Sequence, residues 1–304
     1  MEKWTKLKRD IKKSRQLYMM FFPVLVFFIV FRYGPMYGNI IAFMDYKPAK
    51  GIFGSDWVGF KHFIRFFSDP YFWRLLRNTV TLSTSSIVFG MPAAIILALL
   101  LNEIRNAKFK KVIQTATYLP HFVSLVVICG MIKDFVGSDG LITVILSRIG
   151  LVEQQNLLMI PEYYKPIHVI SHIWQSVGWD SIIYLSALSA IDQEQYEAAD
   201  LDGAGRFAKM RYITIPCIMP TISVMLIMKT GHIMSVGYEK IILLYNSLIY
   251  ETSDVISSYV YRVGLNQQSW SYSSAVGLLN SVINFIILML ANKISAKYSE
   301  TSLW

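Results

Sequence analysis

The sequence predicts an all-α fold: a polytopic membrane protein with six transmembrane helices and both the N- and C-termini in the cytosol. Of the 304 residues, 54% are hydrophobic and only 16% are charged, and the mean hydropathy is +0.42. Several apolar stretches approach the ~20 residues that a helix needs to cross a bilayer. The basic residues behind the net charge of +9 lie beside these stretches, as cytosolic anchors do, and form no patch interleaved with aromatic rings. This pattern argues against nucleic acid as a partner.

The chain divides into a basic cytosolic N-terminus, residues 1–16, and a single transmembrane domain, residues 17–304. We expect the spans at about 17–44, 75–101, 112–132, 166–190, 218–244 and 273–291. The first should kink near Pro35, and the third should be interrupted at Pro120 and His121.

The direction of insertion follows from the basic N-terminus, which favours the cytosol. The first external segment, residues 45–73, also holds lysine and arginine, so the charge bias alone supports this direction only in part. An even number of spans then places the long polar interval at residues 192–217 in the cytosol as well.

This interval is expected to fold as two short helices joined by a tight turn. Asp192 is a suitable N-cap for a helix over residues 193–201, and Gly203 and Gly205 permit a turn with positive φ. Pro216 is tolerated near the first turn of the apolar helix that follows. Its small and charged residues favour a docking element over a catalytic one.

The spacing of residues in this interval resembles the EAA loop of permease subunits in binding-protein-dependent ABC importers. The family pattern usually ends in Leu-Pro, where this chain has Ile215-Pro216. The resemblance implies that Glu197 caps the coupling helix, that Ala198 and Ala199 fit a groove of an ATPase, and that Gly203 makes the turn. The residues matched to ATPase coupling are Glu197, Ala198, Ala199, Asp200, Gly203, Ala204, Ile213, Ile215 and Pro216.

Polar side chains inside the expected spans are the candidates for a substrate path, because hydrocarbon penalises them unless they face protein or water. The candidates are Trp174, Gln175, Trp179, Asp180, Tyr184, Lys229, His232, Asn280 and Asn284. Aromatic rings beside amide and hydroxyl groups suit sugars. The alternative is that these groups only bond helices to one another, with Lys229 paired to an acid on a partner subunit.

No constellation of residues indicates an enzyme. The chain lacks a GxxxxGK[ST] phosphate-binding loop, so ATP-driven work would have to come from a partner. His168 and His172 have metal-ligand spacing but no third ligand, and Cys129 and Cys217 lie far apart, so we expect no metal site and no disulfide. We therefore expect a transport subunit without catalytic residues or a bound cofactor. The alternative hypothesis is that the protein is a membrane enzyme.

Further stretches narrow the family. The segments GYEKIILLYN, SYVYRVGL and SYSSAVGL, together with the terminal Leu-Trp, look like those of LplB-type sugar permeases. This resemblance implies a bacterial cell membrane and a carbohydrate cargo of the oligosaccharide kind. It also implies a second homologous permease, two cytosolic ATPase subunits that bind ATP and Mg²⁺, and an extracellular substrate-binding lipoprotein. A polyol or a glycerophosphodiester is the alternative cargo.

Overall fold

A computed structural model describes residues 13–298 of the chain, so most of the basic segment 1–16 and the terminal Leu-Trp lie outside the described residues. Helices dominate this part, and the β-structure in it is one two-residue antiparallel pair that joins Met44 to Trp57 and Asp45 to Asp56. The elements are α2 (Arg15–Phe28), η1 (Ile29–Tyr33), α3 (Gly34–Met36), η2 (Tyr37–Phe43), β1 (Met44–Asp45), η3 (Pro48–Lys50), β2 (Asp56–Trp57), α4 (Lys61–Phe67), α5 (Phe72–Glu103), α6 (Ala107–Phe122), α7 (Leu125–Val136), α8 (Leu141–Arg148), η4 (Leu157–Met159), α9 (Pro161–Ser189), α10 (Gln193–Leu201), α11 (Arg206–Lys209), η5 (Met210–Thr214), α12 (Ile215–Thr230), α13 (Tyr238–Leu244), η6 (Ser247–Ile249), α14 (Tyr250–Ser253), α15 (Ile256–Tyr261), η7 (Arg262–Asn266) and α16 (Trp270–Tyr298).

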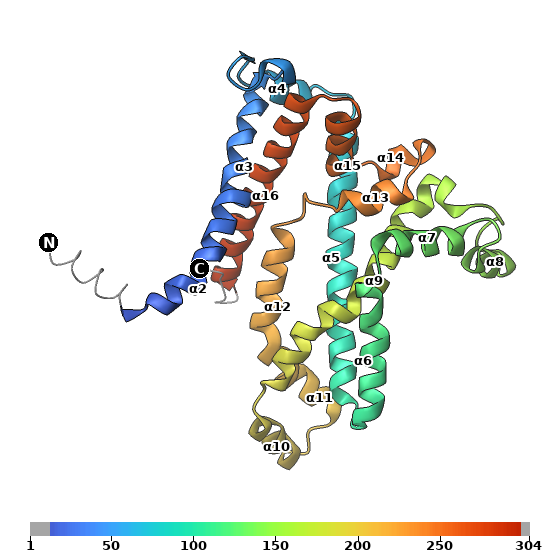
Figure 1. Cartoon of the computed structure of the whole chain (residues 1–304). Coiled ribbons are helices and arrows are strands. Elements are labelled where there is room, and N and C mark those ends of the chain that lie inside the picture. The colour runs from blue at the N-terminus through green and yellow to red at the C-terminus, as the bar shows by residue number, and fades with distance from the viewer. Residues whose placement is uncertain (1–12, 299–304) are drawn as a thin grey trace.

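The long helices form two groups that meet around α12 (Figure 1). The path from η1 to η2 runs beside α16, and α5, α6 and α9 pack together on the other side of α12. Helix α4 and α15 lie at one end of the molecule, here called the outer end, and α10 and α11 lie at the opposite, inner end. Buried apolar side chains form three separate clusters: around α7, α9 and α13, around α4, α15 and α16, and around the inner halves of α5, α9 and α12.

Four helical stretches among the described residues are long and apolar enough to cross a membrane, or five if the bent pair of α6 with α7 and α8 counts as one. They are Arg15–Phe43, Phe72–Glu103, Arg206–Thr230 and Trp270–Lys297. The sequence predicted six. Helix α9 has the length to span but falls outside this group, because its middle carries polar groups such as His168, His172 and Asp180.

The expected third span, residues 112–132, is not a straight helix. Pro120 lies inside α6, and the break comes after Phe122, where the chain bends by 101° into α7 and α8. Proline therefore does not end this helix where the sequence suggested. Helix α7 begins after Ser124 and extends away from α5 and α6 (Figure 1).

The expected fifth span, residues 218–244, is also interrupted. Helix α12 ends at Thr230, and residues 231–237 form a turn and an irregular stretch before α13 begins. A Cβ at Gly231 would lie 2.7 Å from Cδ1 and 3.2 Å from Cβ of Leu288, so a larger residue here would require Leu288 to shift. The backbone of Met234 then bonds to asparagine side chains of α16 instead of to its own helix.

Two helices change their winding just before a proline. The N–H of Gly34 donates to the carbonyl of Ile29, and the N–H of Ile215 donates to that of Met210, which are i to i−5 bonds of a π turn. Pro35 and Pro216 follow directly, and neither has an N–H for the usual i to i−4 bond. The kink predicted at Pro35 is thus a π turn, through which the helical path continues to Phe43.

Buried charges at the outer end are paired within the chain. The Asp254 side chain is fully buried and accepts hydrogen bonds from Arg262 Nη1 at 3.1 Å, Arg262 Nη2 at 2.5 Å and Ser258 Oγ at 2.8 Å. Arg74 Nη2 lies 3.6 Å from the same carboxylate. The side chain of Asn78 in α5 donates to the Asp254 carbonyl at 3.0 Å, so this network joins α5 to α14 and α15.

Candidate functional site

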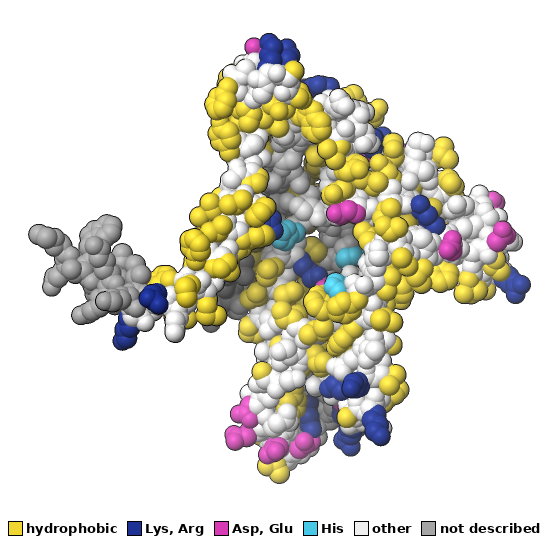
Figure 2. All heavy atoms as spheres, in the orientation of Figure 1, with side chains coloured by type: hydrophobic (Ala, Val, Ile, Leu, Met, Phe, Trp, Pro, Cys, Tyr) yellow, Lys and Arg dark blue, Asp and Glu magenta, His cyan; other side chains and the backbone are white. Residues whose placement is uncertain are grey.

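A cavity of about 510 Å³ lies in the middle of the molecule, walled by α5, α9, α12, α13 and residues 231–237, with a contribution from the α6–α7 bend. Figure 2 shows the hollow with histidine and lysine side chains on its walls. Four of the five histidines of the chain line it, together with two lysines: His121, His168, His172, His232, Lys229 and Lys240. Such a polar space inside apolar helices is what a hydrophilic cargo would need.

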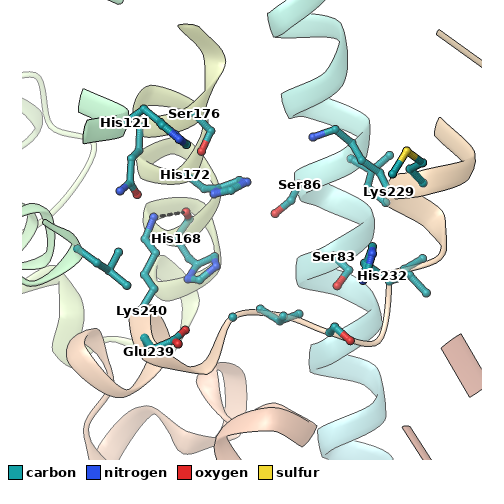
Figure 3. A pocket seen from close by; sticks show the side chains of 18 of the residues that line it. Ser83, Ser86, His121, His168, His172, Ser176, Lys229, His232, Glu239 and Lys240 are labelled. Atoms are coloured by element: carbon teal, nitrogen blue, oxygen red, sulfur yellow. Dashed lines mark hydrogen bonds between the residues drawn. The ribbon is translucent and has the colours of Figure 1, made fainter. Parts of the chain in front are cut away.

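The wall formed by α9 follows from helical periodicity. His168, His172 and Gln175 are separated by four and three residues, which places them on one face of the helix. Ser83 and Ser86 on α5 lie three residues apart and line the cavity as well. In Figure 3 the imidazole of His172 extends from α9 toward Ser86. Helices α5 and α9 thus present hydrogen-bonding groups to each other across the cavity.

Of the nine residues predicted for a substrate path, three line the cavity: Gln175, Lys229 and His232. Asp180 lies behind Lys229 and pairs with it, with 2.7 Å between the carboxylate oxygen Oδ2 and Nζ. The acid that neutralises Lys229 therefore belongs to this chain, and no partner subunit is needed to supply it.

The three aromatic candidates lie elsewhere. Trp174 lines a separate apolar pocket of about 440 Å³ between α7, α8 and α9. The ring of Trp179 stacks on His121, with 4.6 Å between the centroids and 2° between the planes. Tyr184 is fully buried in the inner core cluster. The spacing of residues along α9 could not predict which of these side chains face the cavity. Other helices cover α9 on several sides, so a side chain that points inward can face a neighbouring helix instead of the cavity.

The two asparagines of α16 hold the break after α12 and do not line the cavity. Asn284 Oδ1 accepts from the backbone N–H of Met234 at 2.9 Å, and its Nδ2 donates to Ser235 Oγ at 2.7 Å. Asn280 Nδ2 donates to the carbonyl of Met234 at 3.0 Å. These bonds favour the alternative reading, in which the asparagines join one part of the chain to another.

Sequence reasoning missed Lys240, His168 and the two serines of α5 as cavity residues. Lys240 stands in an apolar run that was expected to lie inside the fifth span, and the break at residues 231–237 turns it toward α9 instead. His168 and His172 were considered as metal ligands or as packing histidines, and not as part of a substrate path. Among residues 13–298, no group of three or more side chains could hold a metal ion.

The interval at residues 192–217 forms the second candidate region, at the inner end (Figure 1). Asp192 caps α10 as predicted, since its side chain accepts from the N–H of Glu194 at 3.0 Å. Gly203 has a φ of +74°, which confirms the predicted left-handed turn, whereas Gly205 has a φ of −72° and does not need to be glycine for this reason. The second helix is not separate: α11, η5 and α12 follow one another without a break.

Side-chain contacts hold α10 to the segments that follow it, including a 3.4 Å hydrogen bond from Cys217 Sγ to Gln195 Oε1. Tyr196 Oη lies 2.9 Å from Thr214 Oγ1, and Lys209 forms an ion pair with Asp200. Neither α10 nor α11 has a buried residue. The side chain of Leu201, in the polar part of this region, is 91% exposed, which is typical of a surface that a partner covers. Phe207 and Tyr212 lie at the inner end of the apolar stretch Arg206–Thr230 and are 70% and 74% exposed.

Comparisons with known proteins agree on one family. The sequence pattern of the "binding-protein-dependent transport system inner membrane component" family matches residues 90–299. The chain is 44% identical to protein LplB of Bacillus subtilis, over 97% of this chain and 92% of that protein. It is 42% identical to the polygalacturonan/rhamnogalacturonan transport system permease protein YteP of the same species, over 100% of this chain and 94% of that protein.

A solved structure shows the same fold. It is a chain of a bacterial alginate ABC transporter crystallised in complex with an alginate pentasaccharide-bound periplasmic protein. The TM-score is 0.88 and the sequence identity 41%, with 98% of this chain and 100% of that chain covered. A second structure, of a bacterial ABC transporter involved in the import of the acidic polysaccharide alginate, matches with a TM-score of 0.87 at 42% identity, over 96% of this chain and 99% of that chain.

Proposed function

The chain belongs to the family of inner membrane components of binding-protein-dependent transport systems, and from that premise we propose that it is the permease subunit of an ATP-driven importer of oligosaccharides. It is a multi-pass membrane protein and a transport subunit, not an enzyme. The observation that carries the proposal is the polar cavity of about 510 Å³ enclosed by otherwise apolar helices. The YteP protein and the solved alginate transporter are named for polysaccharides, which favours a saccharide over a polyol or a glycerophosphodiester.

The proposed topology has six crossings with both termini in the cytosol of a bacterial cell. Four apolar stretches and the bent α6–α7 pair support five of them, and α9 is the sixth. Its polar residues face the cavity and the ion pair with α12, so a low mean hydropathy does not prevent it from spanning. Helix α2 begins and α16 ends away from α4, toward the inner end, as this topology requires (Figure 1).

Cysteine labelling tests the topology in a variant that lacks the exposed Cys217. The side chains of Phe53 and Leu201 are 94% and 91% exposed and mark the outer and inner ends. We expect Phe53→Cys to react with an impermeant thiol reagent in intact cells, and Leu201→Cys to react only after the membrane is opened. Labelling of Leu201→Cys from outside would invert the topology. Ser55, also in the outer segment, is unsuitable because its hydroxyl is bonded to Gly51 and Lys47.

Coupling to ATP hydrolysis is assigned to the segment 192–217. We propose that the importer has two cytosolic ATPase subunits, which bind ATP and Mg²⁺, and that one of them covers Leu201, Phe207 and Tyr212 and seats against Ala198 and Ala199. A second homologous permease would complete the path, and an extracellular binding lipoprotein would deliver the saccharide at the outer end. The crystallised alginate transporter with its periplasmic protein supports the last of these partners.

Reconstitution tests the function. The tagged chain would be isolated from its native membrane with its partner chains and placed in proteoliposomes, with the binding lipoprotein on the outside. We expect ATP hydrolysis only when the partner chains are present, and ATP-dependent accumulation of oligosaccharides. ATP hydrolysis or chemical conversion of the saccharide by the purified chain alone would contradict the proposal, and accumulation of glycerol or sorbitol without any saccharide would favour the polyol alternative.

A further inference from the structure

Lys240 occupies an unusual position in the cavity wall. Its side chain is 6% exposed, although it belongs to a residue type that is rarely buried without a partner. The ammonium Nζ donates a long hydrogen bond, 3.4 Å, to the backbone carbonyl of His168. Figure 3 shows the Lys240 side chain reaching along α9 toward His168 and His172, so the charge lies at the surface of the cavity and not in the apolar core behind it.

No carboxylate balances this charge within the part of the chain that the structure describes. The ion pairs found there involve Asp45, Asp56, Asp180, Asp200 and Asp254, and Lys240 takes part in none of them. The neighbouring Glu239 also lines the cavity, but in Figure 3 its carboxylate lies away from the Lys240 amine.

Lys229 provides the internal contrast. It lines the same cavity, but its ammonium lies 2.7 Å from Asp180 and is neutralised there. A buried ammonium without a counter-ion costs several kilocalories per mole of lost hydration, which a bound anion would offset. The cavity therefore contains one lysine whose charge is satisfied by the chain and one whose charge is open to a ligand.

The surroundings of Lys240 suit a saccharide that carries an acid group. Ser83, Ser86 and Ser176 offer hydroxyl groups to the cavity, and His172 offers a ring nitrogen. These are partners for sugar hydroxyls, whereas the ammonium suits a carboxylate. His168 Nδ1 is buried with no hydrogen-bond partner among the described residues and adds a further unused polar atom on the same wall.

We propose that Lys240 forms an anion subsite that binds the carboxylate of a uronate residue as an acidic oligosaccharide passes through the cavity. This inference rests on the proposed function and narrows it from saccharides in general to those with carboxylate groups. Lys240 contacts the cargo directly and determines specificity.

The test compares an acid with its own methyl ester, which keeps the sugar backbone and removes the charge. Uptake of trigalacturonate, trimannuronate and their methyl esters would be measured in the proteoliposomes described above. We expect the wild-type importer to favour the acids. Lys240→Met should lower the ratio of acid uptake to ester uptake roughly ten-fold or more, the effect of losing one charge-assisted hydrogen bond. Lys240→Arg should retain most of the ratio.

The matched control is Lys133→Met, which removes an exposed lysine of α7 outside the cavity and should leave the ratio unchanged. Because the same binding lipoprotein serves every variant, its own selectivity cancels from the comparison. If Lys240→Met fails to assemble with the partner chains, the uptake ratio of Lys240→Gln is compared with that of the wild type instead. A ratio of acid uptake to ester uptake that is the same in Lys240→Met as in the wild type would overturn the subsite alone. Absence of uptake of any saccharide would overturn the proposed function itself.

Discussion

The outer and inner ends of the molecule differ in how much of their side-chain bonding and packing lies within the chain. At the outer end, the buried carboxylate of Asp254 and the partly buried carboxylate of Asp69 receive hydrogen bonds from side chains of the same chain. At the inner end, α10 and α11 bury no residue, and large apolar side chains such as Leu201 remain exposed. The difference indicates that side-chain networks within the chain hold the outer end together, whereas α10 and α11 have little packing of their own and are proposed to be covered by another protein.

The largest expected effect comes from breaking the outer network. Asp254→Ala would leave the partly buried Arg262 without its carboxylate, and breaking a buried pair costs about 3–5 kcal/mol. We expect a large fall in the thermal unfolding temperature of the detergent-solubilised complex. The control is Asp56→Ala, which removes an exposed carboxylate 3.9 Å from Lys47 and should cost less than about 1 kcal/mol. Equal effects of the two changes would mean that the outer end is not held by this network.

A substitution in the turn of the inner end should separate stability from coupling. Gly203→Val places a β-branched residue at a φ of +74°, which costs roughly 1–3 kcal/mol locally. Since α10 and α11 bury nothing, we expect the isolated chain to melt almost as before while recovery of the ATPase and ATP-driven uptake are lost.

Gly205 offers the matched control two residues away. Its φ is −72°, and a Cβ there would meet no atom within 4 Å. Gly205→Ala should therefore keep both ATPase binding and uptake. Normal uptake by the Gly203→Val complex would show that this turn does not position the docking surface.

Between the two ends, Asn284 links α16 to the break after α12. Asn284→Leu removes its bonds to Met234 and Ser235, and a bond of this kind between membrane helices is worth up to ~2 kcal/mol. We expect a moderately lower unfolding temperature and slower uptake, because residues 231–237 form part of the cavity wall. Slower uptake without any loss of stability would instead indicate that Asn284 contacts the substrate.

The smallest effect concerns the pH dependence of the outer end. Burial alone would raise the pKa of Asp69, but hydrogen bonds from Tyr259, the backbone of Tyr71 and Tyr272, with the charge of Arg65, hold this pKa below its ordinary value of 3.8. A lowered pKa means that the charged carboxylate stabilises the fold above its ordinary pKa and that this contribution is lost as the pH falls through the lowered value. Unfolding temperatures of wild type and Asp69→Asn should therefore differ at neutral pH and converge below about pH 4. A difference that persists at the lowest pH would contradict this role.

The sequence predicted the helical class, the family and the local geometry at Asp192 and Gly203, because these depend on composition or on contacts between near neighbours. It did not predict where α12 ends, since that break depends on Leu288 packing against Gly231 and on Asn284 bonding to Met234, more than 45 residues away. The cavity role of Lys240 depends on the same break and was missed with it. The position of Asn280 inside an apolar span predicted correctly that its side chain faces protein and not lipid. It could not show whether that side chain lines the cavity or joins two parts of the chain.

The π turn at Met210–Thr214 fixes the angular register of the whole inner end. It contains one residue more than an α-helical path would need, and one residue corresponds to a rotation of about 100° and a rise of about 1.5 Å. Deleting a single residue here would therefore leave α12 in place and turn α10 and α11 to face a different direction. The length of this stretch, and not only its chemistry, determines the direction from which an engaging protein must approach.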